Sequence, residues 1–281
     1  MKFIQLILLI LLFNYSYSQK FNSGWNKKLG NNSVTGKYFS SRGIQLYYET
    51  YGKGTPLLFL HGNGGSINDF AYQIPYFAKH FKVIAVDSRA HGNSTDSRDS
   101  LSYEMMADDF NALLDSLHLD SCYVLGWSDG GIVGLLLSIR HPEKVKKLAI
   151  TGANLWPDTS AVDPWAYQQT VSEIDSLSKL PVTPEIKNKL KLAKLLLHEP
   201  HISIQQLNTI TCPTLVMAGD HDVILPKHTL LIAESIPRST LWILPNCGHA
   251  TLIRYKDAFN SNVNTFFKNT FHPFSGKDRF Y

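Results

Sequence analysis

The feature that most constrains the fold is a Gly-x-Ser-x-Gly motif set between two apolar segments. Residues 122–127 are largely apolar, Ser128 stands between Gly126 and Gly130, and residues 132–139 form a second apolar run. This order predicts a strand, a turn too tight for ordinary side chains, and a helix. Glycines are expected where strand and helix pass so closely that a Cβ would clash. The turn exposes the Ser128 hydroxyl, and the helix directs its free N–H groups towards whatever the serine attacks.

Short apolar segments alternate with loops and helical segments on both sides of this motif. Residues 57–60, 83–86 and 145–151 read as strands buried on both faces, and residues 44–51 alternate as a half-exposed strand near the sheet edge. Further strands are predicted over residues 214–218 and 241–244. The alternation predicts an α/β fold with a mostly parallel sheet flanked by helices.

The first 18 residues are predicted to be a secretory signal peptide. Lys2 gives a positive start, residues 3–13 are apolar, and Ser16-Tyr17-Ser18 forms a small-x-small cleavage site. The apolar stretch is shorter than the roughly 20 helical residues that span a bilayer, which disfavours an uncleaved anchor. We therefore expect an exported protein, periplasmic or extracellular, without stable membrane insertion after cleavage near Ser18.

The remaining chain is predicted to divide into five segments. Residues 19–36 are rich in Asn, Ser, Gly and Lys and indicate a flexible lead-in. Several prolines and helical stretches interrupt the strand–helix rhythm between two parts of the core, which predicts a small helical cap. The segments that follow the lead-in are the first part of the core (37–153), the cap (154–209), the second part of the core (210–270) and a polar tail (271–281).

Composition and charge indicate which partners to expect, namely a small-molecule substrate and not nucleic acid. The net charge of +4 is small and no dense Lys/Arg block occurs, so nucleic acid is not expected as a partner. The oligomeric state stays open. The odd number of cysteines leaves at least one free or paired outside the chain. Cys122 and Cys212 are expected to be buried thiols, whereas Cys247 stands two residues before His249 and is expected near the site.

A serine hydroxyl needs a base within hydrogen-bond reach before it can act as a nucleophile near neutral pH. His249 follows the last predicted strand and is the candidate base for Ser128. A carboxylate must then orient the imidazole. Asp220 and Asp222 both follow the preceding strand, and chemistry alone does not separate them. Because these residues come just after strands of a parallel sheet, we expect them to converge at one edge.

The order of elements and loop motifs resembles the α/β-hydrolase superfamily over residues 37–269. By this resemblance the acid is Asp222, the catalytic triad is Ser128, Asp222 and His249, and the backbone N–H groups of Asn63 and Asp129 form the oxyanion hole. Ala90 replaces a glycine of the family pattern, so the turn there is expected to differ if that glycine needs a positive φ. The motifs that carry the resemblance are His61-Gly62-Asn63-Gly64-Gly65, Asp87-Ser88-Arg89-Ala90-His91-Gly92-Asn93-Ser94, Gly126-Trp127-Ser128-Asp129-Gly130, Gly219-Asp220-His221-Asp222 and Cys247-Gly248-His249. The motif around Ser128, extended to Gly131, is most similar to that of valacyclovir-hydrolase-like esterases.

Together these features predict a carboxylesterase-like serine hydrolase that cleaves an ester-type bond of a small molecule through an acyl-enzyme. Trp127, Trp156 and Trp165 are candidate substrate-binding residues, with Tyr167 beside them. No cofactor is implied, and the spacing of the histidines fits no recognised metal site. Two alternatives stay open, namely another reaction of the same triad (thioesterase, carbon–carbon hydrolase, peptidase acting on small substrates, or perhydrolase) and a ligand-binding protein with little turnover on a hydrolase scaffold.

Overall fold

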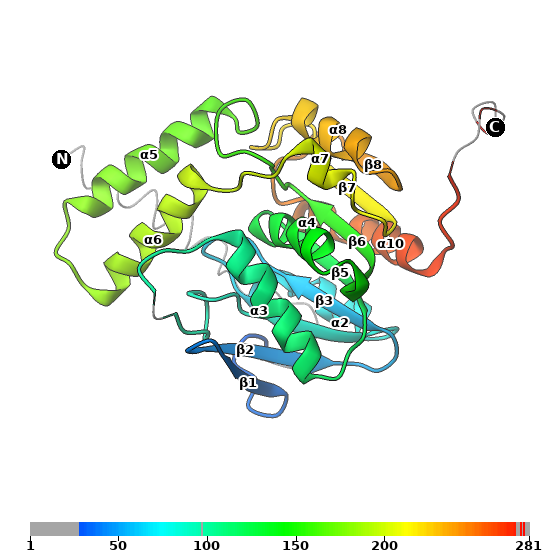
Figure 1. Ribbon diagram of the computed structural model, residues 1–281, viewed down its shortest axis with the longest axis horizontal. Coiled ribbons are helices and arrows are strands. Elements are labelled where there is room, and N and C mark those ends of the chain that lie inside the picture. Colours follow the sequence, from blue (N-terminus) through cyan, green and yellow to red (C-terminus); the bar gives the residue numbers. More distant parts are fainter. Residues whose placement is uncertain (1–27, 97, 274–275, 277, 279–281) are drawn as a thin grey trace.

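The computed structural model describes residues 28–96, 98–273, 276 and 278, and within them one sheet of eight strands forms the centre of the molecule (Figure 1). The strand order is β1-β2-β4-β3-β5-β6-β7-β8, with β2 antiparallel to both of its neighbours and all other pairs parallel. The predicted signal peptide, residues 1–18, lies outside the described residues. The strands are β1 (Gly36–Ser41), β2 (Ile44–Tyr51), β3 (Pro56–Leu60), β4 (Lys82–Val86), β5 (Cys122–Trp127), β6 (Val145–Thr151), β7 (Thr214–Gly219) and β8 (Ser239–Leu244).

Helices cover both faces of the sheet, as the alternation of elements predicts. Alternate residues of β3 show why both faces must be covered, since Leu58 packs into one apolar cluster and Phe59 into the other. The first face carries α3 (Tyr103–Ser116), α4 (Asp129–Arg140) and α8 (Pro226–Ser235), and the second carries η1 (Ile67–Phe70), α2 (Gln73–Phe77) and α10 (Lys256–Lys268). Two short elements, η2 (Pro142–Lys144) and α9 (Thr251–Arg254), complete the core. The predicted α/β fold is therefore confirmed.

The segment predicted as a cap lies between two strands that pair directly in the sheet, β6 and β7. It contains α5 (Pro164–Ser178), α6 (Pro184–His198) and α7 (Ile204–Leu207). Asp163 and Thr183 begin α5 and α6 by accepting hydrogen bonds from backbone N–H groups of the first turn, and a proline at the first helical position follows each. Figure 1 shows α5 and α6 side by side at one end of the molecule, apart from the helices that flank the sheet.

Part of the segment predicted as a flexible lead-in, residues 19–36, is hydrogen-bonded to the sheet in the structure. Gly30 and Asn32 donate their backbone N–H groups to the Glu49 carboxylate over 2.9 and 2.8 Å, and the hydroxyls of Tyr47 and Tyr51 donate to the same group. Glu49 is fully buried, so its charge requires these donors. They fasten residues 30–32 to the sheet, and β1 then covers the outer edge of β2.

The structure also differs from two other expectations, one for β2 and one for the loop after β4. β2 was expected to be half-exposed near the edge, but β1 covers it and most of its residues are buried. The loop after β4 keeps a left-handed turn although alanine replaces glycine, because Ala90 itself adopts φ 63°. This conformation costs an alanine about 1 kcal/mol.

Candidate active site

Ser128 stands on a strained turn between β5 and α4. Its backbone has φ 55° and ψ −121°, a combination that residues with a Cβ rarely adopt. A Cβ on Gly126 would overlap the carbonyl oxygen of Gly130, and one on Gly130 would overlap that of Leu60. The predicted need for both glycines is confirmed. The turn is held by the Ser128 N–H, which donates to the Thr151 carbonyl over 2.9 Å.

His249 and Asp222 meet from the loops that follow β8 and β7. The Nδ1 atom of His249 lies 2.6 Å from Oδ1 of Asp222, whose side chain is fully buried. Burial lowers the pKa of His249, but the carboxylates of Asp222 and Asp129 outweigh this effect and raise it above its ordinary value. Burial raises the pKa of Asp222, but His249 and nearby hydrogen bonds lower it overall. The lowered pKa keeps Asp222 ionised at neutral pH, so that its carboxylate accepts the Nδ1 proton; in the neutral form of His249, Nε2 is then free to accept a proton.

Asp220 has a different position from Asp222, although only one residue separates them. Its carboxylate accepts the backbone N–H groups of Asn246 and Cys247, both over 2.9 Å. Asp220 thus braces the loop that carries His249, and the imidazole that it contacts is that of His221, over 2.8 Å. The structure brings Asp222 to His249, which separates the two candidates that chemistry alone left open.

The loop after β3 approaches Ser128 from the side opposite β6. Gly62 lies so close that a Cβ added to it would sit 3.1 Å from the Cβ of Ser128. His61 fixes this loop, since its Nδ1 lies 2.7 Å from the Gly62 carbonyl and its Nε2 accepts the Ser88 N–H over 3.0 Å. Burial lowers the pKa of His61 to about 3, so it stays neutral in this bracing role.

The side chain of Asp129 belongs to the site, although sequence reasoning considered only its backbone. It is buried, and its Oδ2 accepts from Nδ2 of Asn63 over 3.0 Å. Burial raises the pKa of Asp129 to about 6, against the opposing effect of hydrogen bonds from Asn63 and Tyr103. The acidic residue directly after the serine was a visible signal for this group. Tyr103 on α3, which also bonds to Asp129, could not have been identified from the sequence, because it lies far from Asp129 along the chain.

A cavity of about 790 Å³ opens above Ser128, and its wall includes Asn63, Asp129 and His249. Two of the predicted aromatic residues, Trp127 and Trp165, line it, and Tyr167 does so as well. The indole N–H of Trp127 donates to the His249 carbonyl over 2.9 Å, so this ring also holds the histidine loop.

The structure places Trp156, the third predicted tryptophan, outside the wall of this cavity. Trp156 does not line the cavity, because its indole N–H donates to the Ile202 carbonyl over 3.1 Å and its ring packs edge-on against His228 at 5.0 Å. Through these contacts Trp156 packs the cap segment against α8.

The three cysteines are buried free thiols, as expected for Cys122 and Cys212. Burial raises the pKa of all three, which disfavours reactive thiolates. Among the residues that the structure describes, no three His, Cys, Asp or Glu side chains group closely enough to hold a metal ion. No helix in this part of the chain has the length and apolar character to cross a membrane.

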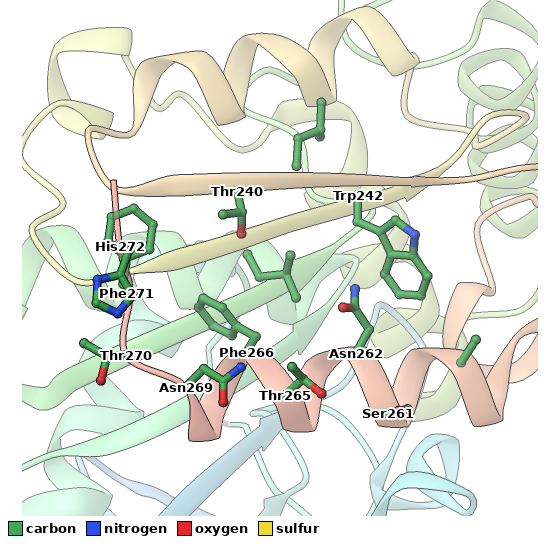
Figure 2. Close-up of a pocket in the computed structure, with 13 residues that line it drawn as sticks. Thr240, Trp242, Ser261, Asn262, Thr265, Phe266, Asn269, Thr270, Phe271 and His272 are labelled. Atoms are coloured by element: carbon green, nitrogen blue, oxygen red, sulfur yellow. The ribbon is translucent and has the colours of Figure 1, made fainter. Parts of the chain in front are cut away.

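A second hollow, of about 720 Å³, lies between β8, α10 and the segment after α10 (Figure 2). Figure 2 shows Trp242 of β8 and Asn262 of α10 pointing toward one another across it. None of the predicted site residues lines this hollow. Ser128 and His249 both line the first cavity instead.

The fold and the first cavity together define a hydrolase of the α/β class. The chain belongs to the alpha/beta hydrolase fold family, whose model matches residues 55–197. It is 30% identical over 257 residues to serine hydrolase BPHL of Mus musculus, covering 83% of this chain and 87% of that protein. It is 28% identical over 268 residues to 2-hydroxymuconate semialdehyde hydrolase of Pseudomonas sp. strain CF600, covering 84% of this chain and 95% of that protein. The solved structure of Est816, described as an N-acyl homoserine lactone degrading enzyme, matches with a TM-score of 0.67 at 26% identity, covering 82% of this chain and 100% of that one.

Proposed function

We propose that this hydrolase is an exported serine esterase that cleaves an ester-type bond of a small molecule through an acyl-enzyme on Ser128. The observation that carries the proposal is the 2.6 Å contact between His249 Nδ1 and Asp222 Oδ1. It leaves Nε2 of His249 as a proton acceptor in the cavity that Ser128 also lines. Two relatives support the proposal, since BPHL is named a serine hydrolase and Est816 degrades a lactone, which is a cyclic ester.

In the first half-reaction Oγ of Ser128 attacks the carbonyl carbon of the ester while Nε2 of His249 takes the hydroxyl proton. Asp222 stabilises the imidazolium that forms. When the tetrahedral intermediate collapses, the carbon–oxygen bond to the alcohol breaks and His249 gives its proton to the departing oxygen. The product is an alcohol and an acyl group bound to Ser128.

The second half-reaction repeats these steps with water as the nucleophile. His249 removes a proton from the water, whose oxygen bonds to the acyl carbon. The second tetrahedral intermediate releases Oγ of Ser128, which recovers its proton from the imidazolium. The acid is freed and the enzyme returns to its starting state.

Both intermediates carry a negative oxygen that needs fixed hydrogen-bond donors. The backbone N–H groups of Asn63 and Asp129 are our candidates, because both residues line the cavity beside Ser128. Each donor of this kind stabilises the transition state by about 3 kcal/mol. The start of α4 at Asp129 adds the positive end of a helix dipole to the same place.

The test compares the purified enzyme with Ser128→Ala on short p-nitrophenyl esters, followed by matched thioesters and amides. We expect hydrolysis by the natural enzyme and a loss of at least about 1,000-fold in kcat for the variant. Equal rates for the two proteins would overturn the proposal. Failure of both on every substrate would favour the alternative of a ligand-binding protein on a hydrolase scaffold.

Export is tested separately, because it rests on the first 18 residues alone. We expect the mature protein to begin near Gln19 when it is recovered from the periplasm or the medium and its N-terminus is sequenced. A protein that keeps Met1 or stays inside the cell would contradict this part of the proposal.

A further inference from the structure

One face of the cap helix α6 is hydrogen-bonded to two loops of the core, the loop after β4 and the loop after β3 that lines the active-site cavity. Asn188 Nδ2 donates to the carbonyl of Ala90 over 2.9 Å, in the loop after β4. One turn later, the Leu192 carbonyl accepts from Nδ2 of Asn63 over 3.2 Å, in the loop after β3. Lys191 lies between them on the same helical face. The position of α6 is thus tied directly to the residues beside Ser128.

Lys191 attaches α6 to the core through an ion pair. Its ammonium group pairs with the Asp96 carboxylate and donates to the carbonyl of Arg98 over 2.9 Å. The side chains of Asp96 and Lys191 are only 1% and 10% exposed. Asp96 also lies 3.5 Å from Arg89, which is itself held by two hydrogen bonds of 2.6 and 2.7 Å to Asp109. A shielded, doubly bonded ammonium group of this kind fixes geometry in a way that an exposed ion pair does not.

The other lysines of α6 serve as an internal comparison. Lys187 and Lys189 pair with carboxylates, but their side chains are 63% and 49% exposed. Lys194 is exposed, three residues further along the helix. Lys187 also reaches the loop after β4, at Asp99, but both of those side chains are exposed. Among the four lysines, Lys191 is the one that joins α6 to the core through a shielded ion pair.

The side chain of Asn63 bonds to α6, and the backbone N–H of the same residue is a proposed oxyanion donor. Its side-chain amide donates both to the Leu192 carbonyl over 3.2 Å and to the Asp129 carboxylate over 3.0 Å. Both partners are acceptors, so only the NH₂ end of the amide satisfies them. Because this one NH₂ group bonds to α6 as well as to Asp129, we expect a shift of α6 to move Asn63. The backbone N–H of that same residue is the donor assigned to the oxyanion.

We propose that Lys191 is a positioning residue, which holds α6 against Asp96 so that the Leu192 carbonyl keeps Asn63 and its N–H in place for the oxyanion. This inference rests on the proposed function, since it assumes that Asn63 is an oxyanion donor. A displaced Asn63 N–H would destabilise mainly the transition state, because the carbonyl oxygen of the bound substrate carries little charge for this donor to stabilise. Loss of Lys191 is therefore expected to act on kcat more than on KM.

The first experiment measures kcat and KM of Lys191→Met on a short p-nitrophenyl ester, well below the unfolding temperature. We expect kcat to fall roughly tenfold, as a displacement of less than 1 Å would cause, with KM changed by less than about threefold. The matched control is Lys194→Met, which removes the same charge from an exposed position of the same helix and should stay within about twofold of the natural enzyme. Lys191→Arg should recover most of the lost kcat. An unchanged kcat in Lys191→Met, or an equal loss in Lys194→Met, would overturn the inference.

The second experiment is a double-mutant cycle with Asn63→Ala, which keeps the backbone N–H but removes the amide. If Lys191 acts through Asn63, Lys191→Met should lower kcat by less than about twofold in the Asn63→Ala background. An unreduced tenfold loss in that background would overturn the inference. Should Lys191→Met fail to fold, Lys191→Gln replaces it in both experiments. Ser128→Ala separates the two proposals, because activity in that variant refutes the serine mechanism itself, whereas an additive cycle refutes only the role of Lys191.

Discussion

Strain at the active-site serine gives a prediction that concerns stability rather than activity. Ser128 is held at φ 55° and ψ −121° because the chain must turn from β5 into α4 within one residue. An alanine at this position keeps the strain, whereas a glycine adopts the same backbone freely. Ser128→Ala and Ser128→Gly both remove the hydroxyl, so the two variants differ mainly in how they tolerate this conformation.

The size of the difference follows from two opposing terms. The strained conformation costs a residue with a Cβ about 1–3 kcal/mol. Glycine loses about 0.5–1 kcal/mol more than alanine in conformational freedom when the chain folds. The net result is that Ser128→Gly should be more stable than Ser128→Ala by about 1 kcal/mol, or about 2–4 °C in Tm for a chain of this size.

Urea and thermal unfolding of the two variants measure this difference, and both should lack esterase activity. The control is Ala258→Gly at an exposed position of α10, where glycine should destabilise by about 1 kcal/mol. The alanine-to-glycine change thus has opposite signs at the two positions. If Ser128→Gly is less stable than Ser128→Ala, the turn is not strained and the reasoning fails.

Two further predictions concern the acid and the base. Asp222→Asn should lower kcat by about 10⁴-fold on an ester substrate. Asp220→Asn, which only loosens the loop before His249, should lower kcat at most about tenfold. Equal losses in the two variants would contradict the assignment of Asp222. The base must be neutral to work, so kcat/KM should fall as the pH drops through the pKa of His249, which lies above its ordinary value of 6.5. Asp129→Asn removes one of the two carboxylates that raise this pKa, and the acidic limb should then move to lower pH; a limb that stays in place would show that the Asp129 charge does not reach the base.

The core of this fold could be predicted from the sequence because its signals are local. A strand buried on both faces must be apolar throughout, and the glycines of the serine turn are required by backbone contacts within a few residues. Gly126 and Gly130 were identified on that ground, and Cβ atoms on them would overlap backbone oxygens. His249 was chosen as the base on another local signal, its place in the loop that follows the last strand.

What the sequence did not reveal depends on contacts between distant segments. β1 has no clear alternation of apolar residues, and it is ordered through its pairing with β2 and the buried Glu49 nearby. Trp156 and Trp165 look alike in the sequence, yet only Trp165 lines the cavity, because the cap geometry decides where each ring points. The Lys191–Asp96 pair joins residues far apart in the chain, and nothing in the helical pattern distinguished Lys191 from its neighbouring lysines.

Covalent labelling with a fluorophosphonate tests the central claim, which is that Ser128 is a nucleophile activated by His249 and Asp222. Such a reagent phosphonylates an activated serine and yields a stable adduct that mass spectrometry of the digested protein can place. We predict one adduct, located on the peptide that contains Ser128, together with complete loss of esterase activity. The adduct should be absent from Ser128→Ala and should form far more slowly in His249→Ala. Labelling of another residue, or an unlabelled Ser128 in an enzyme that hydrolyses esters, would contradict the account.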